Sequence, residues 1–219
     1  MKNISIYDMD RTITRYGTFT PFLFFAAKRR PMRLALLPLY LLSLIGYPLK
    51  LMDRLRLKQL GFRLMIGRRV DATSLSDLAN AYADHVCKTN MYARARDQIN
   101  LDKSEGRVLV LATASPDFYA AEIGKRLGFD HVLGTVQTRA DDGFYLAQIS
   151  GANCYAHEKL RRIEEWLPAP RQDCHIRFYS DHHSDEPVLA WADEAVPANP
   201  NRKLQALAKA RNWTIKSYA

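Results

Sequence analysis

Acidic side chains are the residues of this sequence best placed to do chemistry, because they follow short apolar runs typical of buried strands. The polar residues at the ends of these runs are Asp8 and Asp10, then Thr113, then Asp181 and Asp185. A carboxylate can serve as a nucleophile, and carboxylate oxygens are ligands that suit Mg2+. An Asp-x-Asp pair alone is also a common loop feature, or a metal clamp in glycosyltransferases, so it needs support from the rest of the chain.

The strands that must position these residues alternate with helical segments. Apolar runs occupy residues 4–7, 107–112, 176–180 and 195–197, and polar residues follow each of the first three. Strands that alternate with helices predict an α/β fold with a doubly wound, parallel, Rossmann-like sheet. In such a sheet the site lies at the carboxyl ends of the strands, so we expect the polar residues to converge there.

Helical patterns fill most of the remaining chain. They run from residue 13 to about residue 100, including 53–66 and 73–88, and recur at 117–127, 157–166 and 203–211. Residues 132–149 predict a hairpin that turns at Asp141, Asp142 and Gly143. The pattern predicts a catalytic core of residues 1–12 and 101–219, with a helical cap of residues 13–100 inserted after the first strand.

Four motifs, in order along the chain, resemble those of the haloacid dehalogenase superfamily of phosphotransferases. Residues 8–12, Asp-Met-Asp-Arg-Thr, look like its D-x-D-x-T signature, and residues 108–113 match its second motif, an apolar strand ending in Ser or Thr. Lys159 stands at a helix start, where the third motif has its lysine, and residues 180–185 resemble the fourth motif, G-D-x-x-x-D. The position of the insert resembles the subfamily with a helical cap, which includes phosphoserine phosphatases.

The resemblance implies that the first and fourth motifs carry the chemistry of phosphomonoester hydrolysis. Asp8 would be the nucleophile that forms an aspartyl-phosphate, and also a ligand of Mg2+. Asp10 would be the general acid for the leaving oxygen and then the base for water, with its main-chain carbonyl on the metal. Asp181 would be a further metal ligand.

The resemblance also assigns residues that support the reaction. The Thr113 hydroxyl and the Lys159 ammonium would hold the transferring phosphoryl oxygens. Asp185 would orient Lys159 or a metal-bound water. Taken one at a time, the same residues have ordinary structural roles: a helix cap for Thr113, a surface lysine for Lys159 and a turn residue for Asp185.

A further group of residues is expected to contact substrate or to hold the loops of the site: Thr12, Ser115, Asn153 and His182. The pair His182 and His183 also suggests a metal ligand. Adjacent side chains on an extended or turn segment diverge, however, so we expect two exposed loop histidines that do not share one ion.

One departure from the family pattern concerns the substrate. In phosphoserine phosphatases a glutamate shortly after the first motif holds the substrate ammonium, and the matching position here is Gly17. No acid occurs between Asp10 and Asp53. The ammonium of an amino-acid substrate would be left unpaired in a closed site, which is costly, so phosphoserine is disfavoured.

Positive charge is concentrated in one part of the sequence. The 219-residue chain has a net charge of +9, and residues 28–69 contain eleven bases and one acid, so the rest of the chain is nearly neutral. The partner of this basic, leucine-rich stretch should be anionic: a membrane surface, a nucleic acid or a phosphorylated substrate.

Within this stretch, residues 34–49 contain no charge. As a helix they would span about 24 Å, shorter than the ~30 Å core of a bilayer, and Pro38 and Pro48 interrupt them. They are either the core of the cap or an interfacial segment between basic flanks that suit anionic lipid. With an apolar, basic cap on a phosphatase core, the chain resembles the bacterial phosphatidylglycerophosphate phosphatases of the same superfamily.

Three functions follow from these patterns. The first is a Mg2+-dependent phosphatase of a phospholipid headgroup, such as phosphatidylglycerophosphate, at the membrane surface. The second is a soluble phosphatase of a small phosphorylated metabolite. The third is a nucleic-acid-binding or regulatory module without catalysis, which a leucine-rich insert without spaced stacking aromatics does not favour, so no nucleic-acid partner is expected.

The sequence also suggests where the protein acts. Three well-separated cysteines form no C-x-x-C pair, which argues against a disulfide framework and a Cys-type zinc site. The first ten residues already contain two acids, which is unlike a signal peptide. We therefore expect a cytoplasmic protein, peripheral on the inner face of the membrane if residues 34–49 are interfacial.

Overall fold

The computed structural model describes residues 1–46 and 52–218, so Tyr47–Leu49 of the apolar run and Lys50 lie outside the described residues. Its centre is a five-stranded sheet in the order β4-β3-β1-β7-β8, and every pair is parallel. The strands are β1 (Lys2–Tyr7), β3 (Val108–Pro116), β4 (His131–Thr135), β7 (Cys174–Ser180) and β8 (Glu194–Pro197). The predicted doubly wound parallel sheet is confirmed.

Strand β1 lies in the middle of the sheet, between β3 and β7. Ile4 pairs with Val108 on one side and with Ile176 on the other. This register brings the carboxyl ends of the three strands to one level. The residues that follow β1 and β7, beginning with Asp8 and Asp181, therefore emerge side by side.

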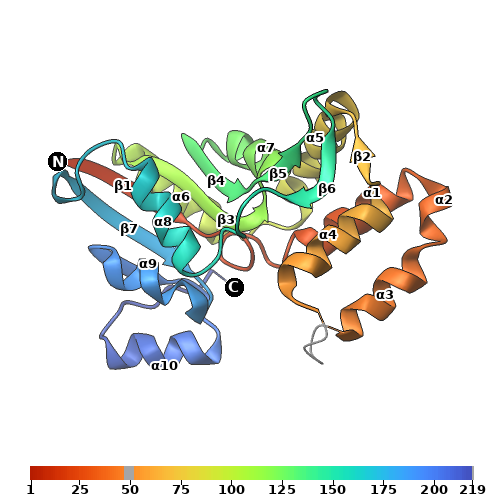
Figure 1. The fold of residues 1–219 in the computed structure, drawn as a ribbon. Coiled ribbons are helices and arrows are strands. Elements are labelled where there is room, and N and C mark those ends of the chain that lie inside the picture. The colour runs from red at the N-terminus through yellow and green to blue at the C-terminus, as the bar shows by residue number, and fades with distance from the viewer. Residues whose placement is uncertain (47–51, 219) are drawn as a thin grey trace.

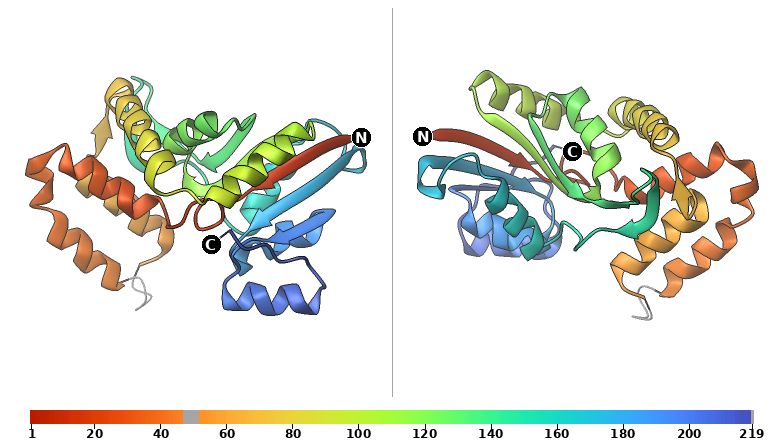
Figure 2. Two further views of the ribbon diagram at one scale, coloured as in Figure 1. Left: turned by 180° about the vertical axis from the view of Figure 1, so that it is seen from behind. Right: turned by 45° about the horizontal axis from the view of Figure 1, so that its top comes forward.

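Helices cover both faces of the sheet, as Figures 1 and 2 show. Tyr7, Leu109 and Leu111 point to one face, where α6 (Ala93–Ser104) and α7 (Asp117–Leu127) lie. Ile4 and Ile6 point to the other, where they pack with α8 (His157–Trp166), α9 (Glu186–Trp191) and α10 (Arg202–Ala210). Short 3-10 turns, η1 (Arg171–Asp173) and η2 (His183–Asp185), flank β7.

Four helices form a separate lobe beside the carboxyl edge of the sheet (Figure 1). They are α1 (Phe19–Lys28), α2 (Pro31–Leu34), α3 (Leu37–Gly46) and α4 (Arg54–Met65), and we call them the helical lobe. Helix α5 (Ala72–Thr89) instead lies against α7, and α6 lies along β3. The division into a core and a cap of residues 13–100 stays a prediction.

The predicted hairpin over residues 132–149 is wrong in its first half. Residues 131–135 form β4, which pairs in parallel with β3 and completes that edge of the main sheet. The hairpin consists of β5 (Gln137–Arg139) and β6 (Tyr145–Ile149), and Gly143 has a positive φ of 84° in its turn. A two-residue strand, β2 (Arg69–Val70), pairs with β6 and so joins the chain after α4 to the core.

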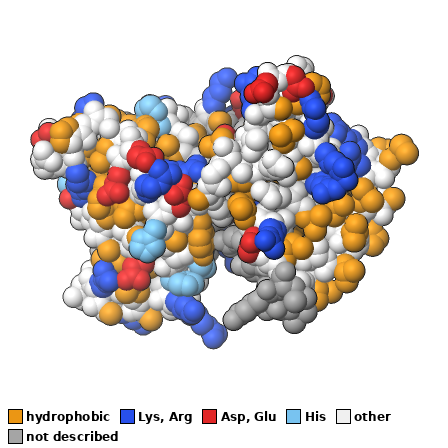
Figure 3. Space-filling view, in the orientation of Figure 1, with side chains coloured by type: hydrophobic (Ala, Val, Ile, Leu, Met, Phe, Trp, Pro, Cys, Tyr) orange, Lys and Arg blue, Asp and Glu red, His pale blue; other side chains and the backbone are white. Residues whose placement is uncertain are grey.

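The described part of the apolar run, residues 34–46, is only partly buried. Tyr40 is the buried residue of α3, whereas Leu39, Leu42 and Ile45 are 51%, 64% and 57% exposed. Hydrophobic side chains accordingly cover the lobe in the space-filling view (Figure 3). Within the described part of the chain, no helix combines the length and the hydrophobicity needed to cross a bilayer.

Candidate active site

The loop after β1 is held against β7. The Asp8 backbone N–H donates to the Tyr179 carbonyl at 2.9 Å, which continues the strand pairing to the first acidic residue. Arg11 then adopts a left-handed conformation with φ of 65°, which turns the chain back sharply. The turn lets the Thr12 hydroxyl lie between two carboxylates, 3.2 Å from Asp8 Oδ2 and 3.4 Å from Asp181 Oδ1.

Lys159, from the first turn of α8, joins two buried carboxylates. Its Nζ donates to Asp8 Oδ1 at 2.8 Å and to Asp185 Oδ2 at 2.6 Å, and its side chain is 2% exposed. Burial disfavours the ammonium, but the carboxylates of Asp185 and Asp8 outweigh it and raise the pKa of Lys159. A charged lysine thus faces the predicted nucleophile.

The carboxylates of Asp8 and Asp181 repel each other in this buried setting. Burial is the largest cause that raises the pKa of Asp8 to about 6, with Asp185 and Asp10 adding to it and Lys159 opposing it. Burial likewise raises the pKa of Asp181 to about 8, reinforced by Asp8 and Asp185. One lysine therefore does not balance the negative charge of this cluster.

Asp10 is held by donors on both of its oxygens. The Thr18 backbone N–H donates to Oδ1 at 2.7 Å, and the Ser115 hydroxyl donates to Oδ2 at 2.8 Å. Because Ser115 has given its one proton, the hydroxyl of Thr18, 3.0 Å away, must donate to it. Tyr119, 3.2 Å from the Thr18 hydroxyl, must then donate in turn, so the chain of hydroxyls points toward Asp10.

Two other predicted site residues lie behind the strand ends. Thr113 is fully buried, and its Oγ1 accepts from the Ser115 N–H at 3.1 Å. Asn153 Oδ1 accepts from the Thr135 hydroxyl at 2.8 Å and from Lys58 Nζ at 2.7 Å. Lys58 also donates to the Ala114 carbonyl at 2.6 Å, so it ties helix α4 of the lobe to the end of β3.

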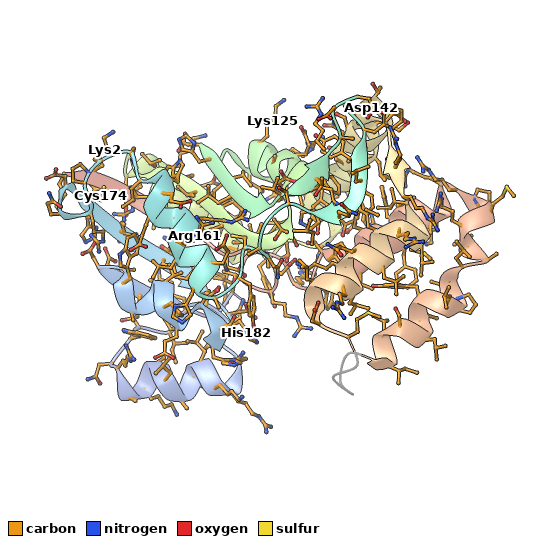
Figure 4. All side chains as sticks on the ribbon, viewed as in Figure 1. Lys2, Lys125, Asp142, Arg161, Cys174 and His182 are labelled. Carbon is orange, nitrogen blue, oxygen red and sulfur yellow. The ribbon has the colours of Figure 1, made fainter. Side chains whose placement is uncertain are left out.

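His182 lies at the carboxyl end of the sheet, on the side of the core that faces the helical lobe (Figure 4). The expected divergence of the two histidines is wrong, because the rings of His182 and His183 are 4.3 Å apart. Both are half-buried rather than exposed, since His182 Nδ1 pairs with Ser184 Oγ at 2.8 Å and His183 Nδ1 with Asn201 Nδ2 at 3.2 Å.

A cavity of about 770 Å³ opens between the sheet and the helical lobe. Its floor carries most of the predicted catalytic and metal-binding residues: Asp8, Asp10, Lys159, Asp181 and Asp185. Its outer wall comes from the lobe and is mostly apolar: Phe19, Pro21, Tyr40 and Leu57, together with Thr20 and Lys58. Gly17, Ser115 and His182 also line the cavity, whereas Thr12, Thr113 and Asn153 stand behind its wall.

The donor set fits a divalent cation that prefers oxygen ligands. Two ionisable carboxylates, Asp8 and Asp181, share the Thr12 hydroxyl, and their raised pKa values show that positive charge is lacking there. Asp185 Oδ1 is buried without a hydrogen-bond partner. In the described part of the chain, no group of three His, Cys, Asp or Glu side chains is arranged to hold a metal ion. The site would therefore combine two carboxylate side chains with a main-chain carbonyl, which is the role expected for the carbonyl of Asp10.

Sequence reasoning missed two residues of the site. Thr18, which precedes α1, resembles an ordinary helix cap, and nothing in the sequence connects it to Asp10. Lys58 is one base among eleven in its stretch. Both come from the helical lobe, so their contacts depend on how the lobe packs on the core.

Comparisons with known proteins identify the family of the chain. Residues 6–190, most of the chain, match the haloacid dehalogenase-like hydrolase family. A phosphoserine phosphatase of Mycobacterium tuberculosis is 29% identical over 155 residues, which are 69% of this chain and 49% of that protein. Protein CicA of Caulobacter vibrioides is 38% identical over 93 residues, 42% of this chain and 40% of CicA. The chain thus spans about half the length of these curated relatives, or less.

Solved structures show the same fold. A Bordetella pertussis protein of unknown function superposes with a TM-score of 0.84 at 21% identity, over the whole of both chains. A phosphoserine phosphatase in its apo form superposes with a TM-score of 0.62 at 13% identity, over 100% of this chain and 94% of that one. With the family match and the shared parallel sheet, the chain belongs to the haloacid dehalogenase-like hydrolases.

Proposed function

We propose that this protein is a Mg2+-dependent phosphomonoester hydrolase that works through an aspartyl-phosphate on Asp8. The observation that carries the proposal is the buried arrangement of Lys159 between Asp8 and Asp185, on the floor of a cavity that Asp10 also lines. Perturbed carboxylates that converge in a cleft with a fixed cation are what nucleophilic attack on a phosphoryl group requires.

The residues divide the reaction into two steps. Asp8 attacks the phosphorus, and the leaving alkoxide takes a proton from Asp10 as the general acid. Asp10, now a carboxylate, then removes a proton from the water that hydrolyses the aspartyl-phosphate. The donors from Thr18 and Ser115 fix the direction of the Asp10 side chain, and the Lys159 ammonium stabilises negative charge beside the transferring group.

The metal would be held by Asp8, Asp181 and the main-chain carbonyl of Asp10. When bound, Mg2+ offsets the charge of the phosphoryl oxygens that would otherwise repel the nucleophile. Asp185 would support this set through its bond to Lys159. Its second oxygen, Oδ1, has no protein partner and can accept from a metal-bound water.

For the substrate we propose a phosphorylated phospholipid headgroup such as that of phosphatidylglycerophosphate. The charged floor and the mostly apolar outer wall of the cavity, with Phe19, Tyr40 and Leu57, suit a molecule with a phosphate at one end and a greasy body at the other. A small phosphorylated metabolite would use the floor alone. Phosphoserine remains disfavoured, because Gly17 stands at the cavity without a carboxylate.

The test of catalysis is Asp8→Asn, assayed for phosphate release with Mg2+. The amide is nearly isosteric but a poor nucleophile, so turnover should fall on the order of a thousandfold or more while the protein stays folded. Asp77→Asn on the exposed side of α5 is the matched control and should keep wild-type turnover. Substantial activity in Asp8→Asn would refute the aspartyl-phosphate mechanism.

The test of the substrate compares three phosphomonoesters with the wild-type protein. Phosphatidylglycerophosphate in mixed micelles should have the highest kcat/KM, a soluble aryl phosphate a lower one, and phosphoserine the lowest. A higher kcat/KM for a small metabolite than for the lipid would refute the lipid assignment and leave the mechanism standing.

A further inference from the structure

Helix α3 carries apolar side chains on two opposite faces. Leu37, Tyr40 and Leu44 form the inner stripe, spaced as one face of a helix, and they pack against the core. Leu39, Leu42 and Ile45 form the outer stripe and are more than half exposed. The inner stripe is enough to attach α3 to the protein, so the fold does not explain the outer one.

More exposed apolar side chains lie on α2, on α3 and on the link between them. Met32 on α2 is 91% exposed, Leu36 between α2 and α3 is 37% exposed, and Leu41 on α3 is 45% exposed. We call Met32, Leu36, Leu39, Leu41, Leu42 and Ile45 the apolar face. Exposed apolar side chains that gather on one part of a surface mark interaction sites in soluble proteins.

Basic side chains border the apolar face, as the blue group beside the orange surface in Figure 3 shows. Lys28 and Arg29 end α1 and are exposed, and Arg30 and Arg33 flank the start of α2. Arg30 donates to the Ile66 carbonyl at 2.6 Å, and Arg33 to the Leu64 carbonyl at 3.0 Å, so both are fixed beside the end of α4. No acidic residue lies between Asp10 and Asp53 in the sequence, and in the fold Asp71 interacts with Arg30.

We propose that the apolar face is a docking surface for an anionic lipid bilayer. Apolar side chains would enter the boundary between headgroups and acyl chains, while Lys28, Arg29, Arg30 and Arg33 contact anionic headgroups. A second copy of the chain is a poorer occupant, because it would bring the same positive charge to the interface. The proposal goes beyond catalysis, since no residue of the cavity floor belongs to the apolar face.

The docked orientation has a geometric consequence. Tyr40, on the inner stripe of α3, lines the cavity that contains Asp8 and Lys159. Helix α3 would therefore lie between the bilayer and the cavity, with its outer stripe in lipid and its inner stripe toward the substrate.

The test is co-sedimentation with phosphatidylcholine vesicles prepared with and without phosphatidylglycerol. Wild-type protein should bind the anionic vesicles more tightly, and rising salt should weaken this binding partly, because only the charge contribution is screened. Leu39→Glu/Leu42→Glu should weaken binding about tenfold or more, since each leucine loses its burial in lipid. Asp8→Asn should bind vesicles like the wild type. Vesicle binding therefore tests docking independently of whether the catalytic proposal is right.

Leu101→Glu is the matched control, because Leu101 on α6 is 50% exposed and lies outside the lobe. It should leave vesicle binding unchanged, and all three leucine substitutions should leave the melting temperature and aryl phosphate turnover near wild type. The proposal is overturned by absence of wild-type binding to anionic vesicles, or by equal weakening in Leu101→Glu. A lipid-free dimer that Leu39→Glu/Leu42→Glu dissociates would overturn it too, by showing that a second copy covers the face.

Discussion

Lys159 connects carboxylates that would otherwise repel each other in a buried place. Its ammonium bonds to Asp8 and Asp185 and its side chain is 2% exposed, so its charge is compensated by protein groups rather than by water. Removing one partner of a buried pair leaves an unpaired charge and costs about 3–5 kcal/mol. Loss of activity in a Lys159 variant therefore needs a folding control, whereas Asp8→Asn leaves the Asp185 carboxylate paired with the ammonium.

A single residue, Gly17, is also expected to affect substrate preference, and Gly17→Glu tests this expectation. A Cβ at Gly17 would meet no atom within 4 Å, and Gly17 lines the cavity, so a side chain can begin there without a clash at its Cβ. Its carboxylate could pair with a substrate ammonium, so kcat/KM for phosphoserine should rise about tenfold over that of Gly17→Gln. Steady-state kinetics of both variants measure the gain. Equal rates in the two would show that charge at position 17 does not select the substrate.

Motif residues could be predicted from the sequence, whereas residues that act through packing could not. Asp8, Asp10, Lys159, Asp181 and Asp185 follow strands or begin a helix, and the parallel sheet brings them to one cavity floor. The position of Thr12 between two carboxylates depends on the left-handed turn at Arg11, which no residue pattern announces because arginine rarely adopts it.

At the scale of elements, α4 is tied to the core through Lys58, and Lys58→Met tests this tie. Methionine keeps much of the length but loses the bonds to Ala114 and Asn153, so the lobe should close less firmly over the cavity. We expect kcat/KM to fall about tenfold with little change in melting temperature.

The matched control for this change lies on the same helix. Arg56→Met alters an exposed base of α4 that points away from the cavity, and it should keep wild-type kinetics. A similar loss in both variants would mean that general positive charge on α4, not the bond across the cavity, supports turnover.

The sequence predicts the strands inside the sheet well, because both of their faces are buried. It predicts an edge strand and a partly exposed helix less well. β1, β3 and β7 lie inside the sheet and have continuous apolar runs, so their positions follow from the sequence. β4 lies at the edge of the sheet, directly before the hairpin β5–β6, and its five residues merge with the hairpin pattern. For α3, apolar residues on both faces hide which face is buried, so Leu44 and Leu41 cannot be distinguished without the fold.

At the scale of the whole molecule, the carboxylate cluster couples stability to pH and to metal. Asp8 and Asp181 have pKa values raised to about 6 and about 8, above the ~3.9 of an unfolded aspartate. Between about pH 4 and 8 the metal-free folded protein binds more protons than the unfolded chain, so its stability falls as pH rises. Carboxylates with lowered pKa values, such as Asp102, change the stability of the protein only at pH values below this range.

We therefore expect the melting temperature in EDTA to fall from pH 5 to pH 8, and Mg2+ to raise it more at pH 8 than at pH 5. The cation favours the ionised carboxylates, and ligand that binds the folded state alone stabilises it. Thermal scans with EDTA or Mg2+ measure both effects. In Asp181→Asn, both the pH dependence of the melting temperature and its increase with Mg2+ should be smaller. An increase with Mg2+ of the same size as in the wild type would contradict the role of Asp181.

The central place of β1 affects how the protein can form on the ribosome. Ile4 pairs with Val108 and Ile176, so β1 is made before both of its neighbours and finds them only after about 100 and 170 further residues. At ~5–20 residues per second, β1 waits on the order of ten seconds or more for its second neighbour, with Ile4, Ile6 and Tyr7 uncovered. Nascent chains that stop before β7 should remain sensitive to protease. Asp8 is thus synthesised well before Lys159 and Asp181, and it reaches its final surroundings only after both have been made.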